Sequence, residues 1–167
     1  MTIYWTDYLA GKEKQVNRVL DSLRKFQLAQ AAAFRRAGET LGISDTALST
    51  LHVLFSPGVD SLPMKDLAHE VGVSPAVLTG LVDKLEERGW VRREHSPVDR
   101  RSIVVVPTVD DESDVAIVLH ALDEPLRRVA NAISSDTAAV VRRLAGAMED
   151  ELRNYDPQSA LSAHSPD

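Results

Sequence analysis

The sequence predicts a mainly α-helical chain that carries one small β-hairpin. Apolar residues recur at helical spacing through most of the first 88 positions, and the same pattern returns after residue 110. Two β-rich runs lie between them, WVRREH at 90–95 and RSIVVVPT at 101–108, separated by the polar tip SPVDR. We therefore expect four helices, a hairpin and two further helices, in that order.

Capping residues set the limits of the predicted helices. Ser and Asp accept backbone N–H bonds at a helix start, and glycine is the usual residue just past a helix end. The first four helices are expected at 12–41 (ended by Gly42), from Ser44 or Asp45 to about Phe55, from about Pro63 to Gly72, and from Ser74-Pro75 to Arg88 (ended by Gly89). The last two are expected at 110–132 and, after a cap at Ser134 or Ser135, to about Tyr155. Pro125 should kink or break the fifth helix, since proline removes a backbone bond and clashes with the preceding turn.

Composition places the chain among ordinary globular proteins. It has 167 residues, of which 44% are hydrophobic and 26% charged, and it contains no cysteine. The lack of cysteine excludes disulfides, thiolate metal sites and cysteine nucleophiles. The sequence has neither an apolar run long enough to span a membrane nor a signal-peptide pattern at its start. We therefore expect a cytoplasmic protein with no membrane contact.

The net charge of -6 is unevenly distributed along the chain. Residues 108–167 carry 5 basic and 12 acidic side chains, whereas residues 61–107 carry 7 of each. Five arginines are concentrated in the neutral segment, namely Arg88, Arg92, Arg93, Arg100 and Arg101. Arginine offers a planar fork that suits phosphate groups and guanine edges. This segment is therefore either a solvated hairpin or a nucleic-acid contact.

The stretch MKDLAHEVGVSPAVLTGLVDKLEERG, residues 64–89, predicts two short helices joined by a tight turn at Gly72. Its small and apolar residues fall where the inner faces of two crossing helices would meet: Leu67, Ala68, Val71, Val73, Leu78 and Leu81. An ordinary pair of packed helices is the alternative. A helix-turn-helix followed directly by a hairpin with arginines at its tip favours a winged helix.

A winged helix places its second helix in the major groove of DNA and its hairpin tip in a neighbouring minor groove. The predicted DNA contacts of that second helix are Ser74, Pro75, Ala76, Val77, Thr79, Gly80 and Lys84. Thr79 can donate or accept at a base edge, and Ala76 and Val77 can contact thymine methyl groups. Lys65 and Lys84 suit phosphates, as do the N–H groups that begin the helix.

Two segments resemble the MarR family of bacterial transcriptional regulators, LAHEVGVSPAVLTGLVDKLEERGWVRRE (67–94) and SPVDRRSIVVVPT (96–108). The resemblance covers residues 12–155 in element order and 61–108 in motif detail. It implies a homodimer with a winged helix-turn-helix in each subunit and with interlocked first and last helices. It also implies a repressor that binds double-stranded DNA and is released by a small aromatic or anionic effector.

By the same resemblance, Asp99, Arg100 and Arg101 form the tip of the wing. Arg100 or Arg101 would enter the minor groove, and Asp99 would orient it. The sequence departs from the family pattern at Pro107, which lacks a backbone donor, so the strand should end there or lie at an edge. It also departs at Gly80, where the family often has a basic residue. Specificity would then rest more on the wing and on DNA shape.

The helices outside the winged core carry apolar faces that need a partner. We expect a single domain over 1–155, with dimerisation helices at 12–41 and 110–155 around a core at 44–108, and a disordered tail at 156–167. A second copy of the chain is the simplest partner. A two-fold dimer would place its two reading helices about one DNA turn apart, roughly 34–36 Å, and would bind a pseudo-palindromic operator.

An effector site of the family's kind would lie between the dimerisation helices and the winged core. The candidate lining residues are Phe34, His52 and Phe55. Packing in the core is the favoured interpretation of these side chains. The histidines show no metal-type spacing, so we expect no metal site and no cofactor.

Two other classes of function are alternatives to DNA binding. An enzyme is not expected, because the sequence contains no nucleophile elbow, no glycine-rich phosphate loop and no HExxH motif. A winged helix that contacts protein without reading DNA remains the alternative. Gly80, the neutral charge of 61–107 and the acidic C-terminal third all favour that alternative.

Overall fold

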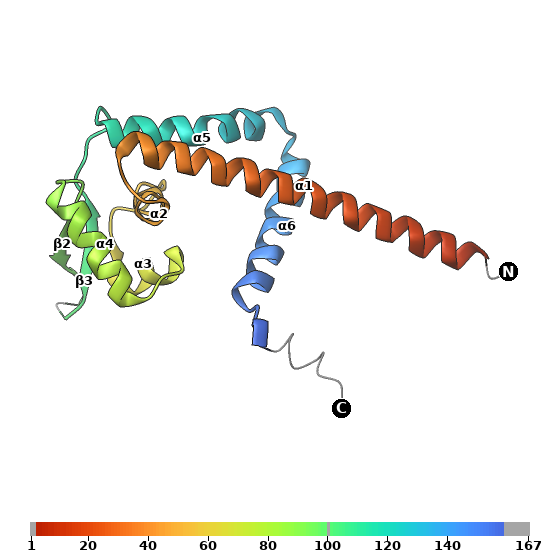
Figure 1. Cartoon of the computed structure of the whole chain (residues 1–167), viewed down its shortest axis with the longest axis horizontal. Coiled ribbons are helices and arrows are strands. Elements are labelled where there is room, and N and C mark those ends of the chain that lie inside the picture. The colour runs from red at the N-terminus through yellow and green to blue at the C-terminus, as the bar shows by residue number, and fades with distance from the viewer. Residues whose placement is uncertain (1–2, 100, 159–167) are drawn as a thin grey trace. The chain divides into compact units, whose positions relative to one another are not determined.

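The computed structural model describes residues 3–99 and 101–158, with side chains described from Lys12 onward (Figure 1). The chain divides into two compact units, Met1–Asp123 and Glu124–Asp167. Helix α5 (Asp114–Ala132) spans this division, and α6 (Ser135–Arg153) belongs to the second unit. The tail expected at 156–167 lies outside the described residues from position 159 onward.

The first unit contains every element of the predicted winged helix. Its elements before α5 are α1 (Ile3–Leu41), α2 (Asp45–Leu54), β1 (Leu62–Pro63), α3 (Met64–Val71), α4 (Pro75–Glu87), β2 (Val91–His95) and β3 (Ile103–Pro107). The prediction of a mainly α-helical fold with a small hairpin is confirmed. The predicted start of α1 at residue 12 is wrong, because the helix already begins at Ile3. No proline interrupts residues 3–11, so nothing local prevents the earlier start.

Serine hydroxyls cap the starts of helices α2, α4 and α6. Ser44 accepts the N–H of Ala47 at 3.2 Å, and Ser134 accepts the N–H of Thr137 at 3.3 Å. Ser74 begins α4 in the same way. The cap is therefore Ser44 rather than Asp45, and Ser134 rather than Ser135, which decides between the alternatives that the sequence left open.

Helix α5 differs from its prediction at two points. It begins at Asp114 rather than at residue 110, because the Ser113 hydroxyl accepts the N–H of Ala116 at 3.2 Å and caps the helix there. It also continues through Pro125, so the predicted break is wrong. The proline deprives only the carbonyl of Ala121 of its usual partner. Ala121 and Pro125 are both exposed, so water can solvate that carbonyl.

The three strands form one antiparallel sheet in the order β1-β3-β2. In the hairpin, Val91 pairs with Pro107 and His95 pairs with Ile103. The sequence did not predict β1, because two residues are too few to show the alternation typical of a strand. β3 ends at Pro107, as predicted from the missing N–H.

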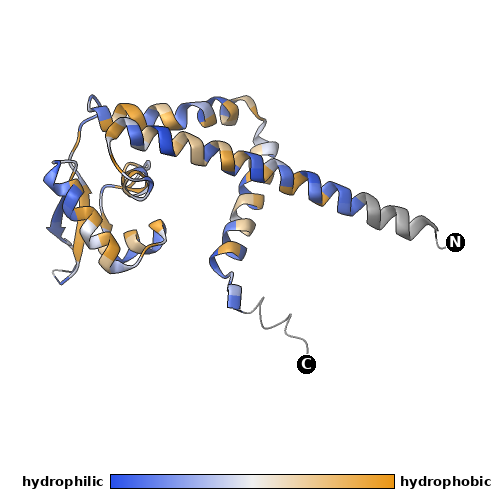
Figure 2. Ribbon diagram, viewed as in Figure 1, coloured by the Kyte–Doolittle hydropathy of each residue, from blue (hydrophilic) through white to orange (hydrophobic). Residues whose placement is uncertain are grey.

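The core lies between α2, α3, α4, the sheet and the start of α5. Its largest fully buried apolar side chains are Leu48, Leu51, Leu54, Leu67, Leu78, Val82, Leu85, Val91, Val105 and Val115. The predicted inner face of the helix-turn-helix is confirmed, since Leu67, Ala68 and Leu78 are buried. Helix α6, by contrast, has no buried residue. Figure 2 shows apolar and polar residues interspersed along α1 and α6.

No helix in the described part of the chain is long and apolar enough to cross a membrane.

Candidate nucleic-acid interface

Helix α4 is buried on one side and open on the other. Leu78, Val82 and Leu85 anchor its inner side in the core, each with at most 1% of its surface exposed. The residues predicted to contact DNA lie on the outer side and are all exposed, namely Ser74, Pro75, Ala76, Val77, Thr79, Gly80 and Lys84. The structure thus brings this predicted set together on one helix, and most of its side chains are small.

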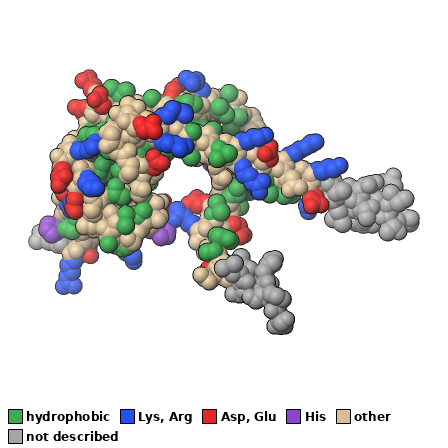
Figure 3. Space-filling view, viewed as in Figure 1, with side chains coloured by type: hydrophobic (Ala, Val, Ile, Leu, Met, Phe, Trp, Pro, Cys, Tyr) green, Lys and Arg blue, Asp and Glu red, His purple; other side chains and the backbone are tan. Residues whose placement is uncertain are grey.

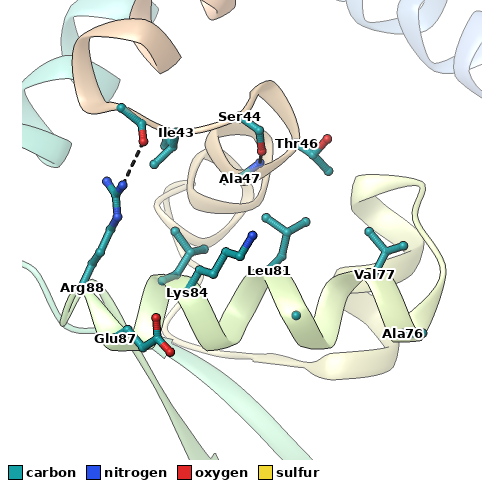
Figure 4. Close-up of a pocket in the computed structure, with 13 residues that line it drawn as sticks. Ile43, Ser44, Thr46, Ala47, Ala76, Val77, Leu81, Lys84, Glu87 and Arg88 are labelled. Carbon is teal, nitrogen blue, oxygen red and sulfur yellow. Dashed lines mark hydrogen bonds between the residues drawn. The ribbon is translucent and has the colours of Figure 1, made fainter.

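A groove of about 990 Å³ runs between the outer side of α4 and the segment that leads into α2 (Figure 4). Four of the predicted DNA contacts line it, Ala76, Val77, Gly80 and Lys84. The opposite wall is formed by Gly42, Ile43, Ser44, Thr46 and Ala47. Gly80 has open space where a side chain would begin, so nothing within the chain fills the groove at that point.

The polar groups at the start of α4 are partly engaged by the helix itself. The Thr79 hydroxyl donates to the carbonyl of Pro75 at 2.9 Å, so it is left to act as an acceptor toward a ligand. The expectation that Thr79 also donates is therefore not met in this conformation. The N–H of Val77 is bonded to the Ser74 hydroxyl, and Pro75 has no N–H to offer.

The tip of the hairpin is a tight, hydrogen-bonded turn. The Ser96 hydroxyl accepts the N–H groups of Val98 and Asp99, each at 3.3 Å. The Asp99 carboxylate accepts the backbone N–H of Arg101 at 3.0 Å, so it orients that residue through the main chain. The side chain of Arg101 is exposed. Arg100, the other predicted minor-groove residue, lies outside the described residues.

Three other arginines of the segment are engaged within the protein. Arg88 donates to the carbonyls of Leu41 and Gly42, each at 2.9 Å, and its guanidinium lies 4.8 Å from the ring centre of Trp90. Arg92 pairs with Glu94. Arg93 pairs with acidic groups of α4. Three of the clustered arginines thus have partners within the protein, and among the described members of the cluster Arg101 has no side-chain bond.

Two lysines of the predicted interface remain available. Lys65 lies in the first turn of α3 and Lys84 in the last turns of α4, and both are exposed. Among the described residues, neither amino group forms a hydrogen bond or an ion pair. A solvated ammonium of this kind can pair with a phosphate without first breaking an internal contact.

Two of the three residues proposed to line an effector site are in contact. The ring of Phe34 contacts the ring of His52 edge-on, with the ring centres 5.4 Å apart. His52 Nε2 lies 2.9 Å from Asp123 Oδ1, and Phe55 packs against the core. These contacts give all three side chains a packing role, which was the favoured interpretation. Within the described residues, no group of three His, Asp or Glu side chains is placed to hold a metal ion.

Comparison with known proteins finds similarity to one family of regulators. The sequence profile of the MarR family matches residues 43–103, which run from the start of α2 into β3. The helix-turn-helix regulator YcgE of Bacillus subtilis, itself described as uncharacterized, is 28% identical over 133 residues, which cover 77% of this chain and 85% of that protein. The chain thus resembles the MarR family over its winged core. The resemblance inferred from the sequence motifs is therefore confirmed.

Further similarities to known proteins agree with this fold. The transcriptional repressor MprA of Escherichia coli K12 is 30% identical over 94 residues, which cover 56% of this chain and about half, 53%, of MprA. The crystal structure of NadR in complex with 4-hydroxyphenylacetate superposes with a TM-score of 0.63 at 21% identity, covering 83% of this chain and 94% of that chain. At that identity the likeness shows the fold alone, which is the winged helix-turn-helix predicted above.

Proposed function

We propose that this protein is a MarR-family regulator that binds double-stranded DNA in a sequence-specific manner, as a homodimeric repressor. The observation that carries the proposal is the outer side of α4. Its exposed residues are small, they border an open groove, and the opposite side of the helix is fixed in the core. A helix anchored on one side and bare on the other can enter a major groove, which is about 12 Å wide.

The chemistry of α4 suits close approach more than extensive base reading. Ala76 and Val77 offer methyl groups to thymine, and Thr79 offers an acceptor to an adenine or cytosine amino group. Gly80 adds no side chain, so it allows the helix backbone to approach the DNA closely. Lys65 and Lys84 supply positive charge for phosphates, which fix register but carry no sequence information.

The wing supplies the second contact in this proposal. Arg101 extends from a turn that Ser96 and Asp99 hold in one conformation. An arginine presented in this way can enter a narrow minor groove, where the negative potential is strongest. Arg100, by resemblance, is the alternative minor-groove residue. Sequence preference then comes from groove shape at the wing and from a few base contacts at α4.

A second copy of the chain would cover apolar surface that the monomer leaves open. In α6, Val140, Val141, Leu144 and Leu152 are at least 47% exposed. In α1, Val16, Val19, Leu20, Phe26 and Leu28 are at least 40% exposed. Figure 3 shows hydrophobic side chains at the surface of both helices. Isologous pairing through the helices at 12–41 and 110–155 would bury these residues and repeat the winged core at 44–108 by a two-fold axis.

Repression and release by an effector are supported by the relatives alone. MprA is named a repressor, and NadR is described in complex with the phenolic anion 4-hydroxyphenylacetate. We extend both properties to this chain as proposals. Phe34, His52 and Phe55 would then line the effector site, with His52 offering a polar atom once it leaves Asp123.

The test is DNA binding measured by fluorescence anisotropy. The probe is a duplex from the region upstream of the protein's own gene, with a scrambled duplex as control, at low and at physiological salt. We expect tight binding to the native duplex that survives physiological salt. Binding to both duplexes that vanishes with salt would contradict sequence-specific reading at this site.

Substitution of Arg101 tests the wing. Arg101→Ala should weaken binding by about 1–3 kcal/mol, or lower the salt slope by about one unit if its contact is to phosphate alone. Arg92→Ala is the matched control, because it removes the same charge from the hairpin where Arg92 is already paired with Glu94. If the double variant Arg100→Ala/Arg101→Ala binds as the native protein does, the wing assignment is wrong.

One observation keeps a second function in view, namely that Arg88, Arg92 and Arg93 are engaged within the protein. A winged helix with so little free positive charge suits contact with another protein. That function predicts no salt-dependent affinity for DNA, and it predicts that Arg101→Ala leaves partner binding unchanged.

A further inference from the structure

We propose that Arg93 positions the wing against α4, so that the reading helix and the wing tip reach one DNA duplex in a fixed relation. The proposal rests on the function proposed above and names a residue that specifies its geometry. Neither the arginine cluster noted in the sequence nor the set of predicted DNA contacts assigns this role to Arg93.

The guanidinium of Arg93 bridges from the hairpin to three residues on successive turns of α4, namely Thr79, Asp83 and Glu86. Nη1 lies 2.6 Å from the Glu86 carboxylate, and Nη2 lies 2.7 Å from that of Asp83. Nη2 also donates to the carbonyl of Thr79 at 3.1 Å. The Arg93 side chain is 24% exposed, so solvent screens these bonds only in part.

The main chain of Arg93 takes part in the same contact. Its backbone N–H donates to Glu86 Oε1 at 2.8 Å, while the other oxygen of that carboxylate accepts from the guanidinium. One carboxylate thus holds both the strand backbone and the side chain of the same residue. Arg93 in turn pairs with Val105 of β3, which is fully buried. The base of the hairpin is therefore tied both to the core and to α4.

The angle at this base decides where the tip lies. Asp99 is six residues beyond Arg93, so the tip is at most roughly 20 Å away at about 3.3 Å per residue. A tilt of about 10° at the base would move the tip by about 3 Å, which is half the width of a minor groove of about 6 Å. A loose hairpin would therefore lose the contact of Arg101 without any change at the tip itself.

Substitution of Glu86 gives a test, because the positioning role and simple electrostatics predict opposite changes in DNA affinity. Glu86→Ala removes a negative charge near the DNA, which by electrostatics alone should strengthen binding. Positioning predicts weaker binding, because Arg93 loses its bidentate partner. Glu87→Ala is the matched control, since Glu87 is the next residue of α4, carries the same charge, is not one of the predicted DNA contacts and has no bond to Arg93.

The first measurement is anisotropy with the duplex from the upstream region. We expect Glu86→Ala to weaken binding about fivefold or more, and Glu87→Ala to bind as tightly as the native protein or more tightly. Arg101→Ala should then have a smaller effect in the Glu86→Ala background than in the native protein, because the wing is held only by Asp83 and Thr79. If Glu86→Ala only reduced the amount of folded protein, Arg101→Ala would weaken DNA binding by the same factor in the native and the Glu86→Ala backgrounds. Equal affinity of the two glutamate variants would overturn the proposal.

The second measurement needs no DNA and so separates this proposal from the proposed function. Hydrogen exchange of the full chain reports how often the amides of β2 and β3 open. Glu86→Ala should speed exchange in 91–107, and Glu87→Ala should leave it at the native rate. Unchanged exchange in Glu86→Ala would contradict the anchoring of the wing. Failure of the native protein to bind any duplex, with faster exchange in Glu86→Ala, would overturn DNA binding while supporting the anchor.

Discussion

Helices α4 and α6 begin alike and differ in what covers their apolar sides. Ser74 and Ser134 each accept the N–H three residues on, both at 3.3 Å. Three large apolar side chains of α4 are then buried in the core, whereas α6 buries none and exposes 47% of Leu144. Local chemistry is therefore enough to start either helix. Once started, a helix is stabilised mainly by the surface that packs against it. For α4 that surface is the core of the same chain, whereas the apolar side of α6 has no partner within the described chain.

The largest expected effect concerns the open side of α6. Val140→Glu/Leu144→Glu places two charges on neighbouring turns of its apolar side, and burying them in a dimer would cost several kcal/mol. We expect the dissociation constant of the dimer to rise by at least about a hundredfold. Light scattering after gel filtration measures the mass. Ala139→Glu, on the same helix but away from that side, should remain dimeric. A double variant with the native mass would show that α6 does not pair.

The same truncation in the two helices sharpens the comparison. Leu78 is fully buried, so Leu78→Ala should lower the free energy of unfolding by about 2–5 kcal/mol. Leu144→Ala should have a much smaller effect, and one that grows with protein concentration because it acts on the dimer. Urea denaturation at two concentrations measures both. Equal, concentration-independent losses would contradict the difference between the helices.

The sequence predicted the parts of the fold that depend on neighbouring residues. The serine caps of α2, α4 and α6 and the turn at Gly72 each need information from only three or four positions, and each was found, whereas the cap of α5 at Ser113 was missed. The two-residue strand β1 was missed because its partner, β3, lies some forty residues further along. The effect of Pro125 was overestimated, because the rule for proline takes no account of whether water can solvate the carbonyl that loses its partner.

For the candidate site, the sequence predicted which residues of α4 face outward, but it misjudged which arginines are available to a ligand. It placed the outer side of α4 correctly, because burial alternates with helical period. It counted five arginines as one charge cluster. The structure shows that Arg88 caps carbonyls 46 and 47 positions away, and that Arg93 bonds to α4. Charge counting cannot separate such residues from Arg101, because their partners are brought near by the fold.

A smaller effect is expected from the caps that begin both helices. Ser74→Ala removes the acceptor for Val77 and should cost about 1 kcal/mol of stability in the first unit. Ser134→Ala makes the same change in α6 and should leave the unfolding of the first unit unaltered. Tryptophan fluorescence follows that unit, since both tryptophans, at positions 5 and 90, belong to it. Equal shifts in the two variants would mean that α6 and the first unit unfold together.

The smallest effect separates two glycines of the helix-turn-helix, Gly80 within α4 and Gly72 at the end of α3. Gly80 lies in the middle of the helix with open space where a Cβ would stand, so Gly80→Ala should stabilise the free protein by up to about 1 kcal/mol. Gly72 also has open space, but its φ of +73° disfavours any side chain, so Gly72→Ala should destabilise by about 1 kcal/mol. Thermal unfolding measures the two opposite signs. If Gly80→Ala also weakens DNA binding while stabilising the protein, the absence of a side chain at that position serves the approach of DNA rather than the fold.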